Sequence, residues 1–157
     1  MDQNSSLIIY TDGSSRGNPG RGGYGAILQW GGAKKELSQG YRNTTNNRME
    51  LMGVLAALGV LKRDGLDIVI YTDSAYIVNS VEKKWVFGWV KKGFAGKKNA
   101  DLWMKFLDYY KRHRIRFVWV KGHADNVWNN RCDVLATTAA DGNQLIADLG
   151  FESGQYN

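Results

Sequence analysis

Three carboxylates stand where a fold could bring them together. Asp12 and Asp73 each follow a threonine at the end of a short apolar run, and Glu50 lies in the first turns of the most regular helical pattern. If the two runs are neighbouring strands, their carboxyl ends place two carboxylates side by side, where open α/β sheets bind ligands. Like charges this close shift each other's pKa and call for a compensating cation. Oxygen ligands without cysteine or paired histidine favour a hard ion, Mg²⁺ or Mn²⁺.

Each of these acids also has an ordinary structural explanation. Asp12 precedes a glycine, as in a common turn, and Asp73 could cap the helix that follows it. Glu50 comes three residues after an asparagine, which fits a capping box. Further along the chain, Asp133 fits an exposed helix surface, and His123 is a single histidine in a Lys-Gly-His turn. Spacing alone does not join these five residues into one site.

The elements that must position these residues follow the order of an α/β fold. Apolar runs predict five strands, at residues 7–11, 24–30, 36–41, 67–72 and 115–120. Helices are predicted at residues 45–62, 74–85, 101–113 and 129–140. The first three strands are close enough in sequence to pair antiparallel, and the later alternation of strand and helix favours parallel addition. We therefore expect a five-stranded mixed sheet, with antiparallel strands first and parallel strands after them, flanked by helices.

Length and composition favour one globular domain. The chain has 157 residues, 43% of them hydrophobic, which excludes general disorder. We expect a single catalytic domain over residues 1–157, with its core at about 7–140 and a loosely ordered tail at 142–157. The longest apolar stretch is shorter than the ~20 residues that span a bilayer, and no signal peptide is evident. A lone cysteine excludes a disulfide framework or a zinc site. These features predict a cytoplasmic protein with no membrane partner.

The charge of the chain is unevenly distributed. Residues 81–121 hold twelve lysines and arginines and three acids, which gives this window a net charge of +9. The whole chain has a net charge of +6, so the residues outside the window are acidic on balance. A basic segment beside a mildly acidic body indicates a polyanionic partner, with nucleic acid the first candidate. A well-solvated basic face explains the same charge equally well.

Four motifs occur in a fixed order along the chain, at residues 11–25, 44–51, 72–74 and 119–136. They include Thr-Asp-Gly-Ser, Asn-Asn-Arg-Met-Glu, Thr-Asp-Ser and Lys-Gly-His-Ala. Together they resemble bacterial type 1 ribonuclease H, over about residues 7–140. The resemblance implies the ribonuclease H fold and an endoribonuclease that hydrolyses the RNA strand of RNA–DNA hybrids, leaving 5′-phosphate and 3′-hydroxyl ends.

The same resemblance assigns catalytic roles. It implies two Mg²⁺ ions, with Mn²⁺ as a substitute, held by Asp12, Glu50, Asp73 and Asp133. Asp12 would contact both ions. Asp133 would complete the site of the ion that activates the attacking water, and Glu50 and Asp73 that of the ion at the leaving 3′-oxygen. His123, on a loop, would help to move protons or to release product.

The resemblance also implies a set of substrate contacts. They are Gly13, Ser14, Asn18, Thr45, Asn46, Asn47, Trp85, Trp89, Lys91, Lys92, Phe94 and Asn99. The residues near the catalytic acids suit contacts to the 2′-hydroxyls of a shallow minor groove, although Asn46 and Asn47 could also cap a helix. Residues 85–94 match a basic, aromatic handle that seats the DNA strand without sequence preference. We expect Trp103 and Trp119 to lie in the core.

Three departures from the family pattern affect these expectations. The chain between Phe94 and Asn99 is shorter than in the longer bacterial handles. Ala75 stands where a glutamine is common, which removes one groove contact. Residues 124–128 bring an extra acid and a tryptophan where the family usually has glycine and proline, and this weakens the case for His123.

Two other functions compete with this interpretation. An integrase or transposase core has its glutamate last and on a late helix, whereas Glu50 lies between Asp12 and Asp73. A hybrid-binding module without catalysis need not keep all four acids. Nothing in the sequence indicates more than a monomer.

Overall fold

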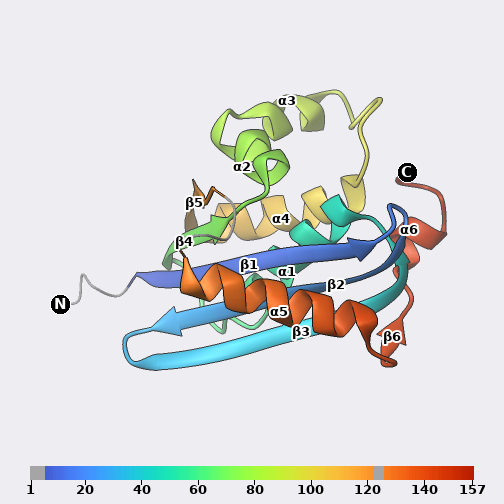
Figure 1. Ribbon diagram of the computed structural model, residues 1–157. Coiled ribbons are helices and arrows are strands. Elements are labelled where there is room, and N and C mark those ends of the chain that lie inside the picture. The colour runs from blue at the N-terminus through green and yellow to red at the C-terminus, as the bar shows by residue number, and fades with distance from the viewer. Residues whose placement is uncertain (1–5, 122–125) are drawn as a thin grey trace.

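The computed structural model describes residues 6–121 and 126–157, which form a mixed β-sheet with helices on both faces (Figure 1). The strands are β1 (Leu7–Arg16), β2 (Gly20–Trp30), β3 (Ala33–Thr44), β4 (Asp67–Thr72), β5 (Arg114–Trp119) and β6 (Leu145–Ile146). The helices are α1 (Asn46–Gly59), α2 (Ala75–Glu82), α3 (Trp85–Lys91), α4 (Ala100–Arg112), α5 (Val127–Asp141) and α6 (Leu149–Glu152).

The sheet has the order β5-β4-β1-β2-β3-β6. The first three strands pair antiparallel, and β4, β5 and β6 are added in parallel. The mixed sheet expected from the sequence is thereby confirmed, but with six strands rather than five. The additional strand, β6, is two residues long, too short to produce a recognisable alternation.

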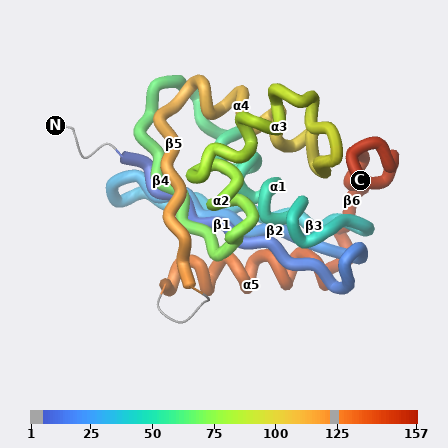
Figure 2. Tube along the Cα trace, turned by 90° about the horizontal axis from the view of Figure 1, so that it is seen from above, coloured from blue at the N-terminus to red at the C-terminus, as the bar shows by residue number. Residues whose placement is uncertain are grey.

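The helices divide into two layers around the sheet. Viewed from above, α5 covers one face, and α1, α2, α3 and α4 lie on the other (Figure 2). The larger core lies on the second face and includes the fully buried Trp103 and Phe106. Trp103 thus occupies the core as expected. Trp119, in contrast, is 50% exposed, because it stands at the last position of the edge strand β5.

Glycines let α5 lie directly on the sheet. A Cβ atom at Gly23, Gly25 or Gly40 would overlap backbone atoms of α5. With hydrogen in these positions, the helix backbone approaches β2 and β3 more closely than side chains would allow. The partner of Gly25 in the ladder is Asp12, so this close approach also brings α5 to the middle of β1.

Strand β1 is longer than the sequence predicts. It continues to Arg16 because its antiparallel pairing with β2 runs on through Asp12 to the pair of Arg16 with Arg21. Its parallel pairing with β4 ends earlier, at Tyr10 and Tyr71. Asp12 and Asp73 therefore both lie just beyond the last parallel pair, side by side as expected, although Asp12 is inside a strand rather than after one.

The C-terminal elements lie at the edge of the sheet. Residues 145–152 contain β6 and α6, which lie beside β3.

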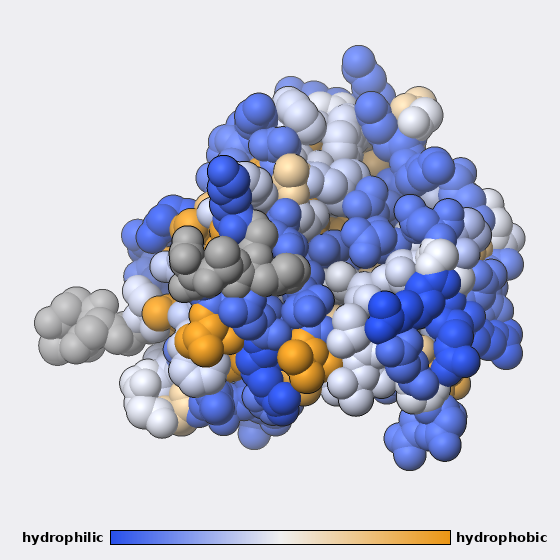
Figure 3. Space-filling view, viewed as in Figure 1, coloured by the Kyte–Doolittle hydropathy of each residue, from blue (hydrophilic) through white to orange (hydrophobic). Residues whose placement is uncertain are grey.

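The helices and one face of the molecule show how its hydrophobic residues are distributed. Among the residues that the structure describes, no helix combines the length and hydropathy that a membrane span requires. On the face that carries α5, hydrophobic residues form small separate groups within a mostly hydrophilic surface (Figure 3).

Candidate active site

Three of the predicted acids form one cluster. Asp12 on β1, Glu50 on α1 and Asp73 directly after β4 each offer a carboxylate oxygen, and these oxygens lie within 4.8 Å of one another. Asp12 and Glu50 are buried, with 4% and 5% of their surface exposed, and Asp73 is half-buried. Three segments that are distant in sequence thus converge on one point, as the sequence predicts.

Local packing explains why Glu50 joins the two aspartates. A Cβ atom at Gly13 would overlap the backbone of Met49 and Glu50, so only glycine lets the first turn of α1 lie against β1 at this point. Thr45 caps α1 by accepting a hydrogen bond from the Arg48 amide at 3.3 Å. Glu50 is therefore not needed as a capping residue.

The capping explanation fails for Asp73 as well. Ser74 is the N-cap of α2, and its hydroxyl accepts a hydrogen bond from the Ile77 amide at 3.2 Å. Asp12 accepts a hydrogen bond from the Gly13 amide at 2.9 Å, but it lies within β1 and not in a turn. None of the three acids is explained by the role that such residues ordinarily play in turns and caps.

Among the residues that the structure describes, two buried carboxylate oxygens of the cluster have no hydrogen-bond partner: Asp12 Oδ2 and Glu50 Oε1. Such atoms are rare in folded proteins because each costs the desolvation of a polar group without a compensating bond. A divalent cation with oxygen ligands would satisfy both atoms and offset the like charges. The residues present therefore fit a hard divalent metal ion.

The electrostatics of the cluster point the same way. Burial raises the pKa of Asp12 to about 8, and the neighbouring charges of Asp73 and Asp133 add to the shift. Burial, followed by the charges of Asp12 and Asp73, raises the pKa of Glu50 well above its usual range. Without a bound cation, the fold holds these carboxylates at a cost in free energy.

Asp133 adjoins the cluster from α5. Its charge contributes to the raised pKa of Asp12, so the two carboxylates are neighbours. It is not within the set of mutually close oxygens formed by the other three acids. Asp12 is therefore the carboxylate shared between Asp133 on one side and Glu50 with Asp73 on the other. His123 lies outside the described residues.

Sequence reasoning missed two side chains that hold this site together. Asn129 is buried, and its amide donates to the carbonyls of Thr11 and Tyr71 at 3.3 and 3.2 Å, which links β1 to β4 beside the acids. The indole of Trp119 donates to the carbonyl of Asp73 at 3.2 Å. The sequence signal for Asn129 was its place in the fourth motif. Trp119 was missed because we expected its side chain to lie in the core.

Most of the expected substrate residues surround the start of α1 and the handle. A cavity of about 270 Å³ joins Asn47 and Asn99 to Trp85 and Trp89 of the handle. Its lysines are Lys97 and Lys98, whereas the expected Lys91 and Lys92 are exposed at the end of α3. The remaining expected residues are Gly13 and Ser14 on β1, Asn18 in the turn after it, and Thr45 and Asn46 at the start of α1.

Phe94 differs from the other expected substrate residues. It is buried in the main core, with 8% of its surface exposed, and its φ is 60°. Asn99 is also buried, at 6% exposed, but it lines the cavity described above. Phe94 therefore supports the handle from inside.

Known proteins place this arrangement in a family. The sequence matches the family model described as RNase H over residues 4–141. The chain belongs to the ribonuclease H family. It is 47% identical to a ribonuclease H of Syntrophus aciditrophicus over 96% of this chain and 89% of that protein. Ribonucleases H are metal-dependent nucleases that hydrolyse the RNA strand of RNA–DNA hybrids, and this activity belongs to the chain as a member of the family.

Solved structures of ribonucleases H share the fold. LC9-RNase H1, described as a type 1 enzyme with the type 2 active-site motif, has a TM-score of 0.76 and 29% identity, covering 98% of this chain and 82% of that one. LC11-RNase H1 in complex with an RNA/DNA hybrid has a TM-score of 0.60 and 26% identity, covering 86% and 96%. The predicted ribonuclease H-like fold is confirmed.

Proposed function

We propose that the chain performs the ribonuclease H reaction at the cluster of Asp12, Glu50, Asp73 and Asp133, with two Mg²⁺ ions. The observation that carries the assignment is the pair of unpartnered buried oxygens, Asp12 Oδ2 and Glu50 Oε1, inside a set of mutually close carboxylates. A structural cluster of acids would be paired with cations of the protein, and among the described residues these two atoms have no such partner.

Asp12 takes part in both halves of the site. With Asp133 it would hold one ion, and with Glu50 and Asp73 the other. When bound, the two ions supply an activated water on one side of the scissile phosphate and charge stabilisation at the leaving oxygen on the other. The overall reaction adds water across the P–O3′ bond, so the products are a 5′-phosphate and a 3′-hydroxyl.

Other residues orient the catalytic acids and the strands of the substrate. Asn129 and Trp119 hold the backbone beside Asp12 and Asp73 through the hydrogen bonds described above. Asn46 and Asn47, exposed in the first turn of α1, are placed to contact 2′-hydroxyls, which distinguish RNA from DNA. His123 is proposed to move protons or to release product.

The substrate proposed for this chain is an RNA–DNA hybrid, the ligand of the related LC11-RNase H1. The groove between the handle and the start of α1 presents two tryptophans and two lysines together with asparagine amides. Aromatic and basic groups of this kind bind nucleic-acid backbones without reading their sequence.

The decisive experiment is cleavage of three labelled substrates of equal length: hybrid, duplex DNA and duplex RNA. With Mg²⁺ we expect cleavage of the RNA strand of the hybrid alone, with 5′-phosphate products, and no cleavage in EDTA. Cutting of duplex DNA, or activity that survives EDTA, would contradict the proposal. Substituting Mn²⁺ for Mg²⁺ tests which metal the site accepts.

A salt titration of hybrid binding tests the proposed surface. Replacing Lys97 and Lys98 by alanine should lower the slope of log affinity against log salt by about two units, because each neutralised phosphate contributes about one unit. The matched pair, Lys91 and Lys92, was expected from the resemblance but lies outside the cavity. If replacing Lys91 and Lys92 lowers the slope more than replacing Lys97 and Lys98, the hybrid binds at the end of α3 and not at the cavity.

The oligomeric state and cellular location belong to the same proposal. We expect a monomer, because helices cover both faces of the sheet (Figure 2), and sedimentation analysis would test it. A cytoplasmic location stays a prediction from the sequence, and cell fractionation would test it.

A further inference from the structure

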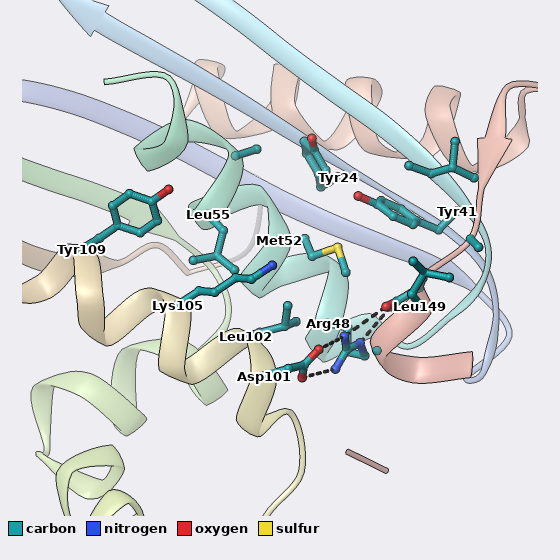
Figure 4. Close-up of a pocket in the computed structure, with 15 residues that line it drawn as sticks. Tyr24, Tyr41, Arg48, Met52, Leu55, Asp101, Leu102, Lys105, Tyr109 and Leu149 are labelled. Atoms are coloured by element: carbon teal, nitrogen blue, oxygen red, sulfur yellow. Dashed lines mark hydrogen bonds and ion pairs between the residues drawn. The ribbon is translucent and has the colours of Figure 1, made fainter. Parts of the chain in front are cut away.

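A cavity of about 420 Å³ lies where α1 and α4 meet the strands β2 and β3 (Figure 4). Helix α1 contributes Met52, Leu55 and Ala56 to its lining, and α4 contributes Lys105 and Tyr109. Residues three or four positions apart lie on one face of a helix, so each helix presents a continuous stripe to the cavity. The volume falls within the range of pockets that bind small molecules, about 300–1,000 Å³.

This cavity is separate from the candidate active site. None of the four catalytic acids lines it, and none of its lining residues was expected at the substrate. Its contact with the first turns of α1 is Arg48, which lies on a different side of the helix from Glu50. A molecule bound here does not touch the acid cluster, so an inference about this cavity does not rest on the proposed function.

The two acids in the lining already serve the fold. Asp148 is 1% exposed, and its oxygens accept hydrogen bonds from Arg48 at 2.8 and 3.0 Å and from the Thr44 hydroxyl at 2.7 Å. Asp101 accepts two from the same guanidinium, at 2.9 and 2.7 Å (Figure 4). With a fifth bond to Asn99 at 3.3 Å, Arg48 uses all of its donors. Neither this arginine nor its two carboxylates remain free to bind a ligand.

Lys105 is the lining cation that has no such partner. Among residues 6–121 and 126–157, no carboxylate lies within ion-pair distance of its ammonium group. The side chain is exposed and extends from α4 toward Met52 on α1, across the cavity (Figure 4). Hydrogen bonds from an ammonium group to a carboxylate are stronger than those between neutral groups. The unpaired charge at this cavity therefore favours an anionic group in the ligand.

Two tyrosines bring hydroxyl groups to the cavity from the sheet. Tyr24 on β2 and Tyr41 on β3 are half-buried, and their ring centroids are 6.3 Å apart. Within the described part of the chain, neither hydroxyl forms a hydrogen bond with another residue, although buried tyrosine hydroxyls usually have a partner. Burial raises the pKa of both hydroxyls, that of Tyr41 to about 12. Both hydroxyls therefore stay protonated at neutral pH and can donate to a ligand.

The rest of the lining is apolar. Met52 and Leu55 are half-buried, and Leu102 is buried beneath them. At the open end, Ile146 and Leu149 are 49% and 77% exposed. Exposed apolar side chains that gather around a concave surface indicate a binding site. Tyrosine rings and a methionine sulfur make favourable contacts with aromatic rings, so this lining suits an aromatic ligand.

We propose that this cavity binds a small aromatic carboxylate. The ring packs against the two tyrosines and the apolar stripe of α1, and the carboxylate accepts hydrogen bonds from Lys105 and from a tyrosine hydroxyl. A cationic ligand fits less well, because the lining acids are already bonded to Arg48. A phosphate monoester carries nearly two negative charges, whereas the described lining offers one unpaired cation.

The test compares two probes of the same shape, 2-naphthoate and its neutral amide, 2-naphthamide. Each is titrated into the full chain in EDTA, so that the carboxylate cannot bind a metal ion at the acid cluster. Calorimetry measures the affinities, and backbone amide signals in NMR spectra locate the site. We expect 2-naphthoate to bind about tenfold more tightly than the amide, the gain typical of a hydrogen bond to a charged group. The signals that shift should belong to α1 and α4.

Two lysine variants test the assigned charge. Lys105→Met removes the ammonium group but keeps an unbranched chain, so it should weaken 2-naphthoate about tenfold and leave 2-naphthamide unchanged. The matched control is Lys111→Met, on the same helix, exposed and outside the cavity, which should change neither affinity. Ala56→Phe fills the cavity and should abolish binding of both probes.

Three results would overturn this proposal. The first is equal affinity of the unaltered chain for the two probes, and the second is an equal loss of 2-naphthoate affinity in the two lysine variants. The third is undiminished binding by Ala56→Phe. If Ala56→Phe does not fold, the lysine variants decide the question, because both replace exposed side chains. Cleavage of the hybrid plays no part in these titrations, so failure of the proposed function is seen separately.

Discussion

Two buried groups of acids lie on opposite sides of the first turns of α1, and they differ in what compensates them. Arg48 and Glu50 are two residues apart, which on an α-helix is about 200°. On the Arg48 side, the carboxylates of Asp101 and Asp148 accept hydrogen bonds from a guanidinium that is itself 1% exposed. On the Glu50 side, Glu50 Oε1 and Asp12 Oδ2 are buried and have no hydrogen-bond partner within residues 6–121 and 126–157.

The difference distinguishes a structural group from the group that we propose to be functional. A buried carboxylate that is fully hydrogen-bonded to an arginine needs nothing further, so the Arg48 group holds the fold together. A buried carboxylate without a cation raises the free energy of the folded protein until a ligand supplies the charge. Both groups contain buried carboxylates, and the partners of these carboxylates separate the structural group from the one proposed to be catalytic.

The largest expected effect is on catalysis. Asp12→Asn should lower cleavage of a labelled hybrid below about 1% of the unaltered rate, because one interaction made in the transition state is worth about 10²-fold or more. Binding of the hybrid should persist, because the groove beside the handle is unchanged. Turnover well above that level would contradict the proposal that Asp12 contacts both metal ions.

The next largest effect is on stability, and it concerns the group of Arg48, Asp101 and Asp148. Asp148→Ala removes one of the two carboxylates that pair with the buried guanidinium of Arg48, and breaking a buried pair costs about 3–5 kcal/mol. Chemical denaturation would measure the change in the free energy of unfolding. The control is Glu152→Ala, which removes the exposed pair with Arg42 and should cost less than about 1 kcal/mol. Equal losses in the two variants would mean that the Arg48 group is not the stabilising one.

The pH dependence of stability should separate the two groups in the absence of metal. The pKa of Asp12 is raised from 3.8 to about 8 in the folded protein, so between these values the folded state binds more protons than the unfolded state. Stability in EDTA should therefore fall as pH rises through this window, and Asp12→Asn should reduce the slope and melt higher at pH 8 by about 5 °C. A variant that melts lower than the unaltered protein in EDTA would contradict a repulsive acid cluster.

The smallest expected effect is the response to Mg²⁺. Because the ion binds only the folded arrangement, it should raise the melting temperature by mass action. This gain should shrink in Asp12→Asn and remain complete in Asp148→Ala, measured as the difference between melts in Mg²⁺ and in EDTA. An equal gain in all three proteins would show that the ion does not bind at the Glu50 side of α1.

Much of the fold and of the candidate site could be predicted from the sequence, for local reasons. The apolar runs that end at Thr11 and Thr72 locate the strands, and the strand order brings Asp12 next to Asp73. The ordered motifs identify Glu50 and Asp133 as their partners and predict the family. These features are readable because strand propensity, helical period and motif order are properties of short stretches of chain.

Only the tertiary structure decided which polar groups have partners. The hydrogen bonds from Asn129 to Thr11 and from Arg48 to Asp148 join residues that are 118 and 100 positions apart. Nothing local distinguishes Asp148, whose buried carboxylate is bonded to Arg48, from Asp12, whose buried Oδ2 has no hydrogen-bond partner among the described residues. The sequence by itself determined which acids are candidates for the catalytic motif, whereas packing between distant segments determined which carboxylates of the described residues are paired with an arginine and which have a buried oxygen without a partner.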